Sequence, residues 1–527
     1  MLRRLARSIA VSPLRATLAV VCAAVSFAVV SGPIAASRFP PMTDLPFHAA
    51  HASILRHYWD PAWHFHEQFE LHPIAVPYLL HYAVAAAFML FMKPLAAVKT
   101  ATVVMLLCVP AGMAVLLRGM KRSATGAVLS LPLAYCTLTH WGFVSYVAAL
   151  GLFAAAIGFA MMVVDRPTPG RRIALGVTLA LLFFAHIFRF PMAIAAVVGT
   201  AIVLYPATRR LRPIVAPVLP SLALFVVWWF VRPRSLEAGA MELHVDLDRA
   251  KEIWPNLFAG FVGGEEKALA GLWGRVAAFV ASASLLAAAV SDRWGEATAR
   301  ERRFAAGAAV IPVVCAAAFL GLFFTLPIQI GVWWYVYPRE ATAAVYMGLA
   351  ALPGLPRRAW ARAPLVAMAA GAAIAFGAFV TRSYAAFNAA TDDFTKIAAQ
   401  IPKAPRLMYL VFDHGGSNRA STPFIHLPAY IQAERGGYLG FNFAWWNAAP
   451  MMFRAANDPI AVLPPRTPTR WEWQPNLFKV REHGAFFDWF LVRSVRSADA
   501  IFQDDPTIER VDHVGTWWLY RRVRGRR

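Results

Sequence analysis

The residues with the clearest potential for chemistry lie in one polar stretch after the first apolar segment of the chain. Asp44 opens this stretch. The histidines that follow it are His48, His51, His57, His64, His66, His72 and His81, half of the 14 in the chain. A carboxylate can act as general base toward a hydroxyl group, and carboxylates and imidazoles both bind divalent cations. We therefore predict that this stretch carries the chemistry of the protein.

Asp44 and His48 are the candidate catalytic residues. They stand four positions apart, so they share one face of a helix that begins at Pro46 or just before it. In this arrangement Asp44 takes a proton from an acceptor hydroxyl or positions a cation, and His48 supports it. The alternative is structural, because Thr43 or Asp44 is also a suitable N-cap for such a helix.

The same stretch contains two histidine spacings that suit a metal ion. His64 and His66 precede Glu67, and His48 and His51 stand three positions apart. Neither spacing matches a closed zinc site, and no cysteine joins them, so histidines that pack with tryptophan and tyrosine are the alternative. A divalent cation, Mg²⁺ or Mn²⁺, therefore stays open as a cofactor. Its candidate ligands are Asp44, His64, His66 and Glu67.

Two arginines interrupt apolar segments farther along the chain. Arg189 lies in a turn between phenylalanines, and Arg339 follows Tyr337 and Pro338. Guanidinium groups bind phosphate in a bidentate manner, so either arginine can hold the phosphate of a lipid. The alternative is that both anchor helices at the membrane surface. The candidate residues for binding the substrate or its lipid phosphate are Arg339, Arg189, His186 and His51.

The composition places these residues in a polytopic membrane protein. The 527 residues have a mean hydropathy of +0.51 and are 59% hydrophobic and 15% charged. The net charge of +22 comes largely from short basic clusters between apolar segments, which set topology, so we expect no nucleic-acid partner.

The apolar segments predict about eleven spans with a cytoplasmic amino end. We place them at residues 17–36, 97–117, 124–140, 143–164, 173–187, 190–205, 214–231, 276–291, 304–326, 340–354 and 364–381. The first is long enough for an uncleaved anchor, although 35–37 also suits a signal-peptidase site. We interpret 74–92 as an outer-surface or re-entrant helix. Whether 74–117 crosses once or twice stays open, but two crossings place the basic cluster at 118–122 on the wrong side.

After residue 381 the composition becomes polar, aromatic and proline-containing. Strand patterns occur at 406–412, 487–493 and 516–521, and helical patterns at 384–400 and 424–435. We therefore divide the chain into a membrane domain at 1–381, with its first outer loop at 37–92, and an extracytoplasmic α/β domain at 382–527.

This arrangement resembles the GT-C superfamily of membrane glycosyltransferases. Asp44 matches the position of the family's first-loop aspartate, His72 and Pro73 look like the entry to its second interfacial helix, and Arg339 is similar in placement to an arginine near the lipid phosphate. Leu45 rather than an acid follows Asp44, and the carboxyl domain lacks a Trp-Trp-Asp motif, so the chain looks like a separate bacterial branch.

The resemblance implies an inverting glycosyltransferase of a bacterial inner membrane. Its donor would be a polyprenyl-phosphate sugar in the membrane lipid, and its acceptor a glycan, lipid or protein on the periplasmic side, where the carboxyl domain would lie. A transporter or flippase of a lipid-linked or anionic substrate, and a metal-binding membrane protein that uses the histidine-rich loop, are the alternatives. The sequence does not specify the sugar, the acceptor, the oligomeric state or the presence of activity.

Overall fold

The computed structural model describes residues 13–72, 78–232, 243–290, 297–331, 333–446, 450–465 and 472–523. The chain forms two compact units. The membrane unit comprises Met1–Ile34, Val103–Thr139 and Phe143–Thr381, and the sheet unit comprises Ala35–Thr102, His140–Gly142 and Arg382–Arg527. The first outer loop thus belongs to the same compact unit as the carboxyl-terminal part. Pro73, part of the predicted entry to the second interfacial helix, lies outside the described residues.

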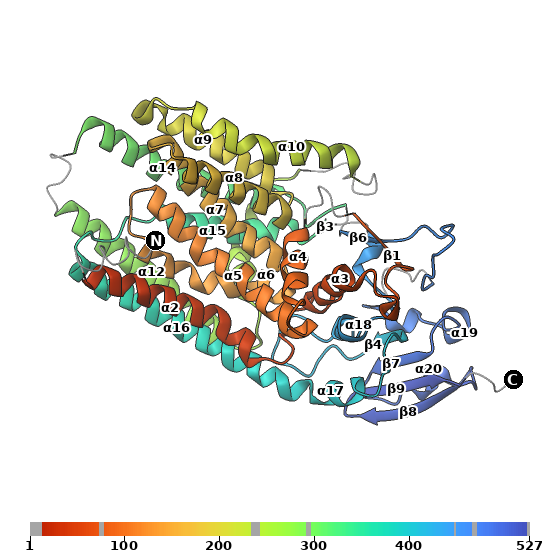
Figure 1. Cartoon of the computed structure of the whole chain (residues 1–527). Coiled ribbons are helices and arrows are strands. Elements are labelled where there is room, and N and C mark those ends of the chain that lie inside the picture. Colours follow the sequence, from red (N-terminus) through yellow and green to blue (C-terminus); the bar gives the residue numbers. More distant parts are fainter. Residues whose placement is uncertain are drawn as a thin grey trace. The chain divides into compact units, whose positions relative to one another are not determined.

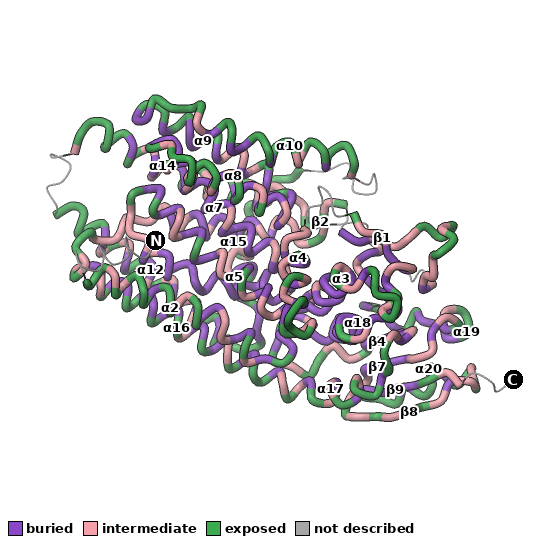
Figure 2. Tube along the Cα trace, viewed as in Figure 1, coloured by how far each residue is buried: buried purple, intermediate pink, exposed green. Residues whose placement is uncertain are grey.

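The membrane unit is a bundle of long apolar helices (Figure 1). The helices are α2 (Pro13–Ala36), α5 (Pro94–Gly119), α7 (Val144–Asp165), α8 (Pro169–Ala185), α9 (Arg189–Thr208), α10 (Val215–Val231), α11 (Ile253–Leu257), α12 (Glu265–Ala289), α14 (Ala299–Thr325), α15 (Val336–Ala351) and α16 (Ala359–Ala390). Helix α6 (Thr137–Trp141) begins in this unit and ends in the sheet unit, and the short strands β2 (Gln329–Ile330) and β3 (Trp333–Trp334) belong to the membrane unit. Most of α7 is buried, whereas α10 exposes much of its surface (Figure 2).

Eight of the described helices are long and apolar enough to cross a membrane. The other three predicted spans correspond to α8, with 17 residues, to α15, with 16, and to a 3₁₀ helix over Ala124–Tyr135. The prediction of an α-helix at 124–140 was therefore wrong, and Pro132, which cannot donate a backbone hydrogen bond, lies inside the 3₁₀ segment. The span predicted at 276–291 begins eleven residues earlier, at Glu265. The count of eleven spans stays a prediction.

Close backbone packing joins α5 to α7. Gly112 lies against Gly151, and Gly119 lies against Gly158, so near that a methyl group on any of the four would overlap backbone atoms of the facing helix. The glycines recur every seven residues on both helices, which keeps them on one face of each. The absence of side chains at these positions is what allows the two helices to approach.

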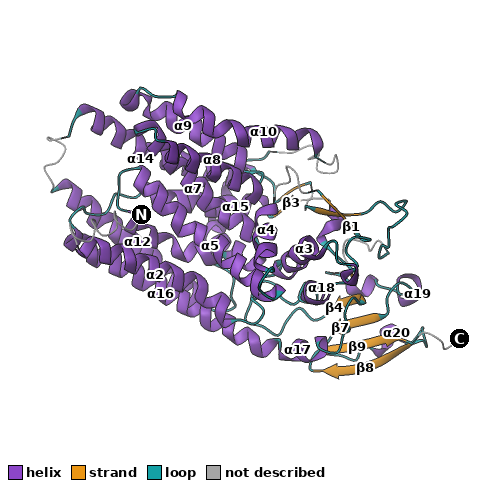
Figure 3. Ribbon diagram, viewed as in Figure 1, coloured by secondary structure: helices purple, strands orange, loops and turns teal. Residues whose placement is uncertain are grey.

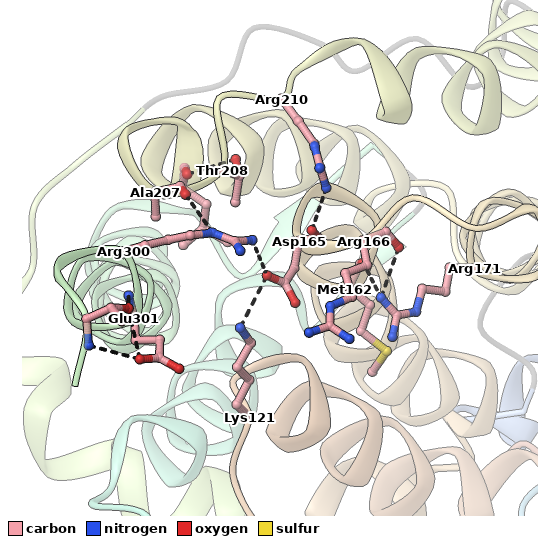
Figure 4. A network of polar contacts seen from close by, with 12 residues as sticks. Lys121, Met162, Asp165, Arg166, Arg171, Ala207, Thr208, Arg210, Arg300 and Glu301 are labelled. Atoms are coloured by element: carbon pink, nitrogen blue, oxygen red, sulfur yellow. Dashed lines mark hydrogen bonds and ion pairs between the residues drawn. The ribbon is translucent and has the colours of Figure 1, made fainter. Parts of the chain in front are cut away.

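At one end of the bundle, basic residues from three segments converge on Asp165 (Figure 4). Lys121 Nζ lies 3.2 Å and Arg300 Nη2 lies 2.9 Å from its carboxylate, and Arg210 donates to its backbone carbonyl at 2.6 Å. The basic clusters near 121, 166, 210 and 300 thus lie together, as an even number of crossings between them requires. Which side of the membrane they occupy stays a prediction.

The sheet unit is built on five strands in the order β5-β4-β7-β9-β8 (Figure 3). Strand β4 (Arg406–Val411) is parallel to β5 (Tyr438–Leu439) and β7 (Trp489–Arg493), whereas β9 (Trp517–Arg522) is antiparallel to β7 and β8 (Ile508–Val514). The three predicted strands are confirmed as β4, β7 and β9. The helices predicted at 384–400 and 424–435 are shorter in the structure. Helix α16 ends at Ala390 and α17 (Asp392–Ala398) follows it as a separate helix, whereas α18 (Ala429–Arg435) begins after Pro428. Helices α19 (Val480–His483) and α20 (Asp499–Phe502) complete this part.

The first outer loop packs with carboxyl-terminal segments inside the sheet unit. It contains α3 (Leu45–His57), β1 (Phe69–Leu71) and α4 (Leu79–Phe88). Strand β1 pairs antiparallel with β6 (Met451–Phe453), and α3 lies against α18 (Figure 1). With 10 residues, α4 spans only about 15 Å, half of a hydrocarbon core, whereas the 26-residue α5 is long enough to cross.

Candidate active site

The carboxylate of Asp44 is directed at a histidine rather than at the helix that it precedes. Asp44 is the N-cap residue of α3, with φ −93° and ψ −8°, but its side chain accepts no capping hydrogen bond. Instead its Oδ1 lies 3.2 Å from Nδ1 of His426, and 19% of the side chain is exposed. The alternative interpretation of Asp44 as a capping side chain therefore does not hold in this conformation. The carboxylate remains available for chemistry.

A backbone turn holds Asp44 in place. The amides of Thr43 and Asp44 donate to the carbonyl groups of His140 and Trp141 at 3.0 and 3.1 Å. Gly142, next in that turn, has φ +95°, and a Cβ there would lie 2.8 Å from both Cβ and N of Asp44. Only glycine meets both requirements, since it tolerates positive φ and leaves room for the aspartate.

His48 lies one helical turn after Asp44, as predicted, but hydrogen-bonds other groups. Its Nε2 donates to the carbonyl of Gly142 at 3.1 Å, and its Nδ1 accepts from the hydroxyl of Tyr82 at 3.0 Å. Burial lowers the pKa of His48, and the nearby Asp44 carboxylate raises it by a smaller amount. His48 thus contacts the same Gly142 turn that holds Asp44, and its support of Asp44 stays a prediction.

His426 is the residue that sequence reasoning missed. Its ring is 4% exposed and is surrounded by Phe47, Phe441 and Phe443 at centroid distances of 4.7, 6.3 and 5.3 Å. Besides the contact with Asp44, its Nδ1 lies 3.2 Å from the carbonyl of Thr43. The signal available in the sequence was a single histidine between apolar residues, which is more often a core residue. No spacing connects it to Asp44.

His51 belongs to a buried polar network that faces the carboxyl-terminal segments. Its Nε2 lies 2.7 Å from Oδ1 of Asn442, whose amide nitrogen donates to Gln432 at 3.0 Å. Burial lowers the pKa of His51 to about 4, so the imidazole is neutral at physiological pH. These contacts give His51 a structural function, and its role in substrate binding stays a prediction.

The remaining histidines of the first loop pack with aromatic and acidic neighbours. Nδ1 of His64 lies 2.8 Å from Oε1 of Glu67, and the ring of His66 lies 4.8 Å from that of Trp59. Across the described ranges of the chain, no three histidine, cysteine, aspartate or glutamate side chains are grouped closely enough to hold a metal ion. The described residues therefore do not fit a dedicated metal centre.

In the membrane unit, Arg189 is buried in an ion pair. Its guanidinium is 1% exposed, lies 2.6 Å from Oε2 of Glu340 and donates to the hydroxyl of Tyr146. That hydroxyl in turn donates to the carbonyl of Arg339 at 2.6 Å. Tyr146 and Glu340 were not predicted as site residues, although Glu340 directly follows Arg339. A phosphate-binding role for Arg189 stays a prediction, and its guanidinium already has an anionic partner.

Arg339 lies closer to the surface of the same unit. It is of intermediate burial, and its guanidinium donates to the carbonyl of Trp334 at 2.9 Å and lies 3.3 Å from Nε2 of His186. The guanidinium also lies 4.4 Å from the ring centroid of Phe143. The structure thus brings together Arg339, Arg189 and His186, the three predicted residues of this unit.

Comparison with known proteins gives matches of structure alone. No protein-family model and no curated protein matches the sequence. Two crystal structures of ArnT from Cupriavidus metallidurans are similar: the one bound to undecaprenyl phosphate has a TM-score of 0.55 at 13% identity over 96% of this chain and 98% of that one. The apo structure has a TM-score of 0.53 at 14% identity, over 95% and 97% of the two chains.

This chain has the GT-C fold. The match confirms the predicted fold class, a polytopic helical membrane protein with a carboxyl-terminal α/β part. Arabinofuranosyltransferase AftD from Mycobacteria has a lower TM-score of 0.47 at 15% identity, over 97% of this chain and 40% of that one. Because the identities are low, the likeness is one of fold. The roles of Asp44 and Arg339 in a reaction stay predictions.

Proposed function

We propose that this chain is an inverting membrane glycosyltransferase that moves a sugar from a polyprenyl-phosphate donor to an acceptor hydroxyl. The observation that carries the proposal is the Asp44 carboxylate. It makes no capping hydrogen bond, is partly exposed and lies 3.2 Å from a histidine, in a chain with the GT-C fold. The binding of undecaprenyl phosphate by the similar ArnT supports a lipid-linked donor. The acceptor would be a glycan, lipid or protein.

In the proposed reaction, Asp44 accepts the proton of the acceptor hydroxyl. The hydroxyl oxygen attacks the anomeric carbon of the donor sugar, and the bond from that carbon to the phosphate oxygen breaks. The electron pair of this bond leaves with the polyprenyl phosphate, so no proton is needed on the leaving group. Inversion at the anomeric carbon follows from a single displacement. A positioned general base of this kind contributes about 10²- to 10⁴-fold.

The phosphate that gains charge in this step would bind Arg339. This guanidinium is of intermediate burial, contacts the Trp334 carbonyl, the His186 imidazole and the Phe143 ring, and interacts electrostatically with Glu340. Arg189 differs in its accessibility, because its side chain is 1% exposed and lies 2.6 Å from the Glu340 carboxylate. We therefore assign the phosphate contact to Arg339 and a supporting position behind it to Arg189. The proposed reaction uses neither Mg²⁺ nor Mn²⁺, since the described residues contain no group of three or more side chains that could hold a metal ion.

We place the protein in a bacterial inner membrane, with the amino end in the cytoplasm and the carboxyl-terminal part in the periplasm. The basic residues around Asp165 support this placement, because basic loops are retained on the cytoplasmic side. The carboxyl-terminal part would then meet acceptors in the periplasm.

The test is sugar transfer by the purified protein in lipid nanodiscs from a panel of polyprenyl-phosphate sugars. Asp44→Asn keeps the size of the side chain and removes the base, so we expect transfer to fall about 10²- to 10⁴-fold with unchanged donor binding. Arg339→Ala should instead weaken donor binding, and Arg172→Ala, an exposed arginine of α8, serves as its matched control.

Equal transfer by Asp44→Asn and wild type would remove Asp44 from the mechanism. An absence of transfer from every donor, combined with lipid binding that Arg339→Ala abolishes, would favour a lipid transporter over an enzyme. Addition of EDTA, and of Mg²⁺ or Mn²⁺ afterwards, tests the cation requirement in the same assay.

A further inference from the structure

The groups around Asp44 in the sheet unit are mostly neutral hydrogen-bonding residues. His48 comes from α3, Tyr82 from α4, and His426 from the segment before α18. The Glu472 carboxyl also interacts electrostatically with Asp44. Burial raises the pKa of Glu472 to about 8, so this carboxyl is mostly protonated at neutral pH. Among the described residues, the close side-chain contact of the Asp44 carboxylate is with His426, whose Nδ1 lies 3.2 Å from Oδ1.

The geometry fixes the tautomer of His426. Its Nδ1 faces two oxygen acceptors, the Asp44 carboxylate and the Thr43 carbonyl, both at 3.2 Å, so the proton resides on Nδ1. Its Nε2 is buried and has no hydrogen-bond partner among the described residues. His426 therefore carries a proton on Nδ1, which donates to the Thr43 carbonyl and faces Oδ1 of Asp44.

We propose that His426 is a positioning residue for Asp44. Its Nδ1, which hydrogen-bonds the Thr43 carbonyl, also lies 3.2 Å from Oδ1 of Asp44 and so fixes the direction of the carboxylate. In this orientation the other oxygen, Oδ2, accepts the proton of the acceptor hydroxyl. The inference rests on the proposed glycosyl transfer for its kinetic consequence, but the contact itself does not.

The proton balance is simple. Asp44 Oδ2 receives one proton from the acceptor as the new glycosidic bond forms, and the proton on His426 Nδ1 remains in place. His426 touches neither donor nor acceptor in this scheme, so its loss should lower kcat and leave the KM values of both substrates nearly unchanged.

Two amide variants separate orientation from packing. The amide nitrogen of His426→Asn takes the place of Nδ1 and can still face Asp44 and donate to the Thr43 carbonyl, whereas that of His426→Gln takes the place of Nε2 and cannot. We expect kcat to fall roughly 10- to 100-fold in His426→Gln and in His426→Phe, which keeps the aromatic packing, because the N–H group that faces the Asp44 carboxylate is lost. His426→Asn should remain within about fivefold of wild type, because it keeps the donor. His513→Gln, a histidine on strand β8, is the control.

The tautomer is measured independently of activity by ¹⁵N NMR of histidine-labelled protein, with the signal assigned by its absence in His426→Phe. We expect a protonated Nδ1, an unprotonated Nε2, and a shift of the Nδ1 signal in Asp44→Asn. A protonated Nε2, or an Nδ1 chemical shift that is the same in wild type and in Asp44→Asn, would overturn the inference even if no donor supports transfer. If wild type transfers sugar, equal kcat in His426→Phe and wild type would overturn it while the proposed function stands.

Discussion

Replacement of Gly142 by alanine tests whether the position of Asp44 determines the activity. Gly142 has φ +95°, and a Cβ at this position would lie 2.8 Å from both Cβ and N of Asp44. Both neighbouring atoms are part of or attached to the backbone, so a side-chain rotation cannot relieve the overlap. The Asp44 backbone, or the turn that carries Gly142, must therefore move.

The structure sets the size of the effect. Ordinary contacts of a Cβ begin near 3.4 Å, so the overlap amounts to about 0.6 Å, and a misplacement of about 1 Å in an active site lowers activity about 10²-fold. We expect Gly142→Ala to lower sugar transfer by roughly 10-fold or more. The positive φ adds a loss of about 1–2 kcal/mol in stability, because alanine is strained in the left-handed region.

The assay is the transfer rate in nanodiscs, together with the thermal unfolding temperature. Gly263→Ala is a matched control, since Gly263 has φ +104° and no neighbouring atom within 4 Å of its Cβ position. Gly263→Ala should lose stability from the positive φ but cause no overlap with neighbouring atoms, so we expect a normal rate of sugar transfer. If Gly142→Ala and Gly263→Ala lose equal stability and both keep full transfer, the reasoning that ties activity to the position of Asp44 is refuted.

Three further predictions concern stability. Glu340→Gln should destabilise the protein by about 3–5 kcal/mol, because it leaves Arg189 buried without its ion pair, and the double variant with Arg189→Met should recover part of this loss in thermal unfolding. Asp165→Asn should cost only about 1 kcal/mol, since the cations beside it are half-exposed, and an effect as large as that of Glu340→Gln would contradict this ranking. His51 has a lower pKa folded than unfolded, about 4 against 6.5, so stability should fall by up to about 3 kcal/mol as the pH drops from 6.5 to 4. His51→Gln should reduce this pH dependence, and an unchanged unfolding profile would argue against the buried neutral imidazole.

Local chemistry explains what could be predicted about the site. Asp44 was identifiable because an acid and a helix start directly follow an apolar span, and the i, i+4 relation placed His48 one turn away. The contacts of these residues were not identifiable, because His48 hydrogen-bonds Gly142 and Tyr82, whereas Nδ1 of His426 is the group that lies 3.2 Å from the Asp44 carboxylate. Pairing between residues so far apart in sequence depends on how the elements pack.

The sequence by itself determined the class of the protein. Apolar segments long enough for a membrane, basic clusters between them and a polar carboxyl-terminal part follow from hydropathy and charge, which act on each segment locally. The strand patterns at β4, β7 and β9 are local in the same sense, because a buried strand needs a short run of apolar residues.

Only the tertiary structure decided the arrangement around the candidate catalytic residues. It placed the first outer loop in one compact unit with residues 382–527, paired β1 with β6, and enclosed His426 between phenylalanines from α3 and from residues 441–443. It also buried Arg189 against Glu340, although a lone arginine in an apolar turn suggested an open phosphate site. The physical reason is the same in each case: burial and the need to satisfy polar groups are properties of the packed chain, and no local pattern encodes which distant residue satisfies them.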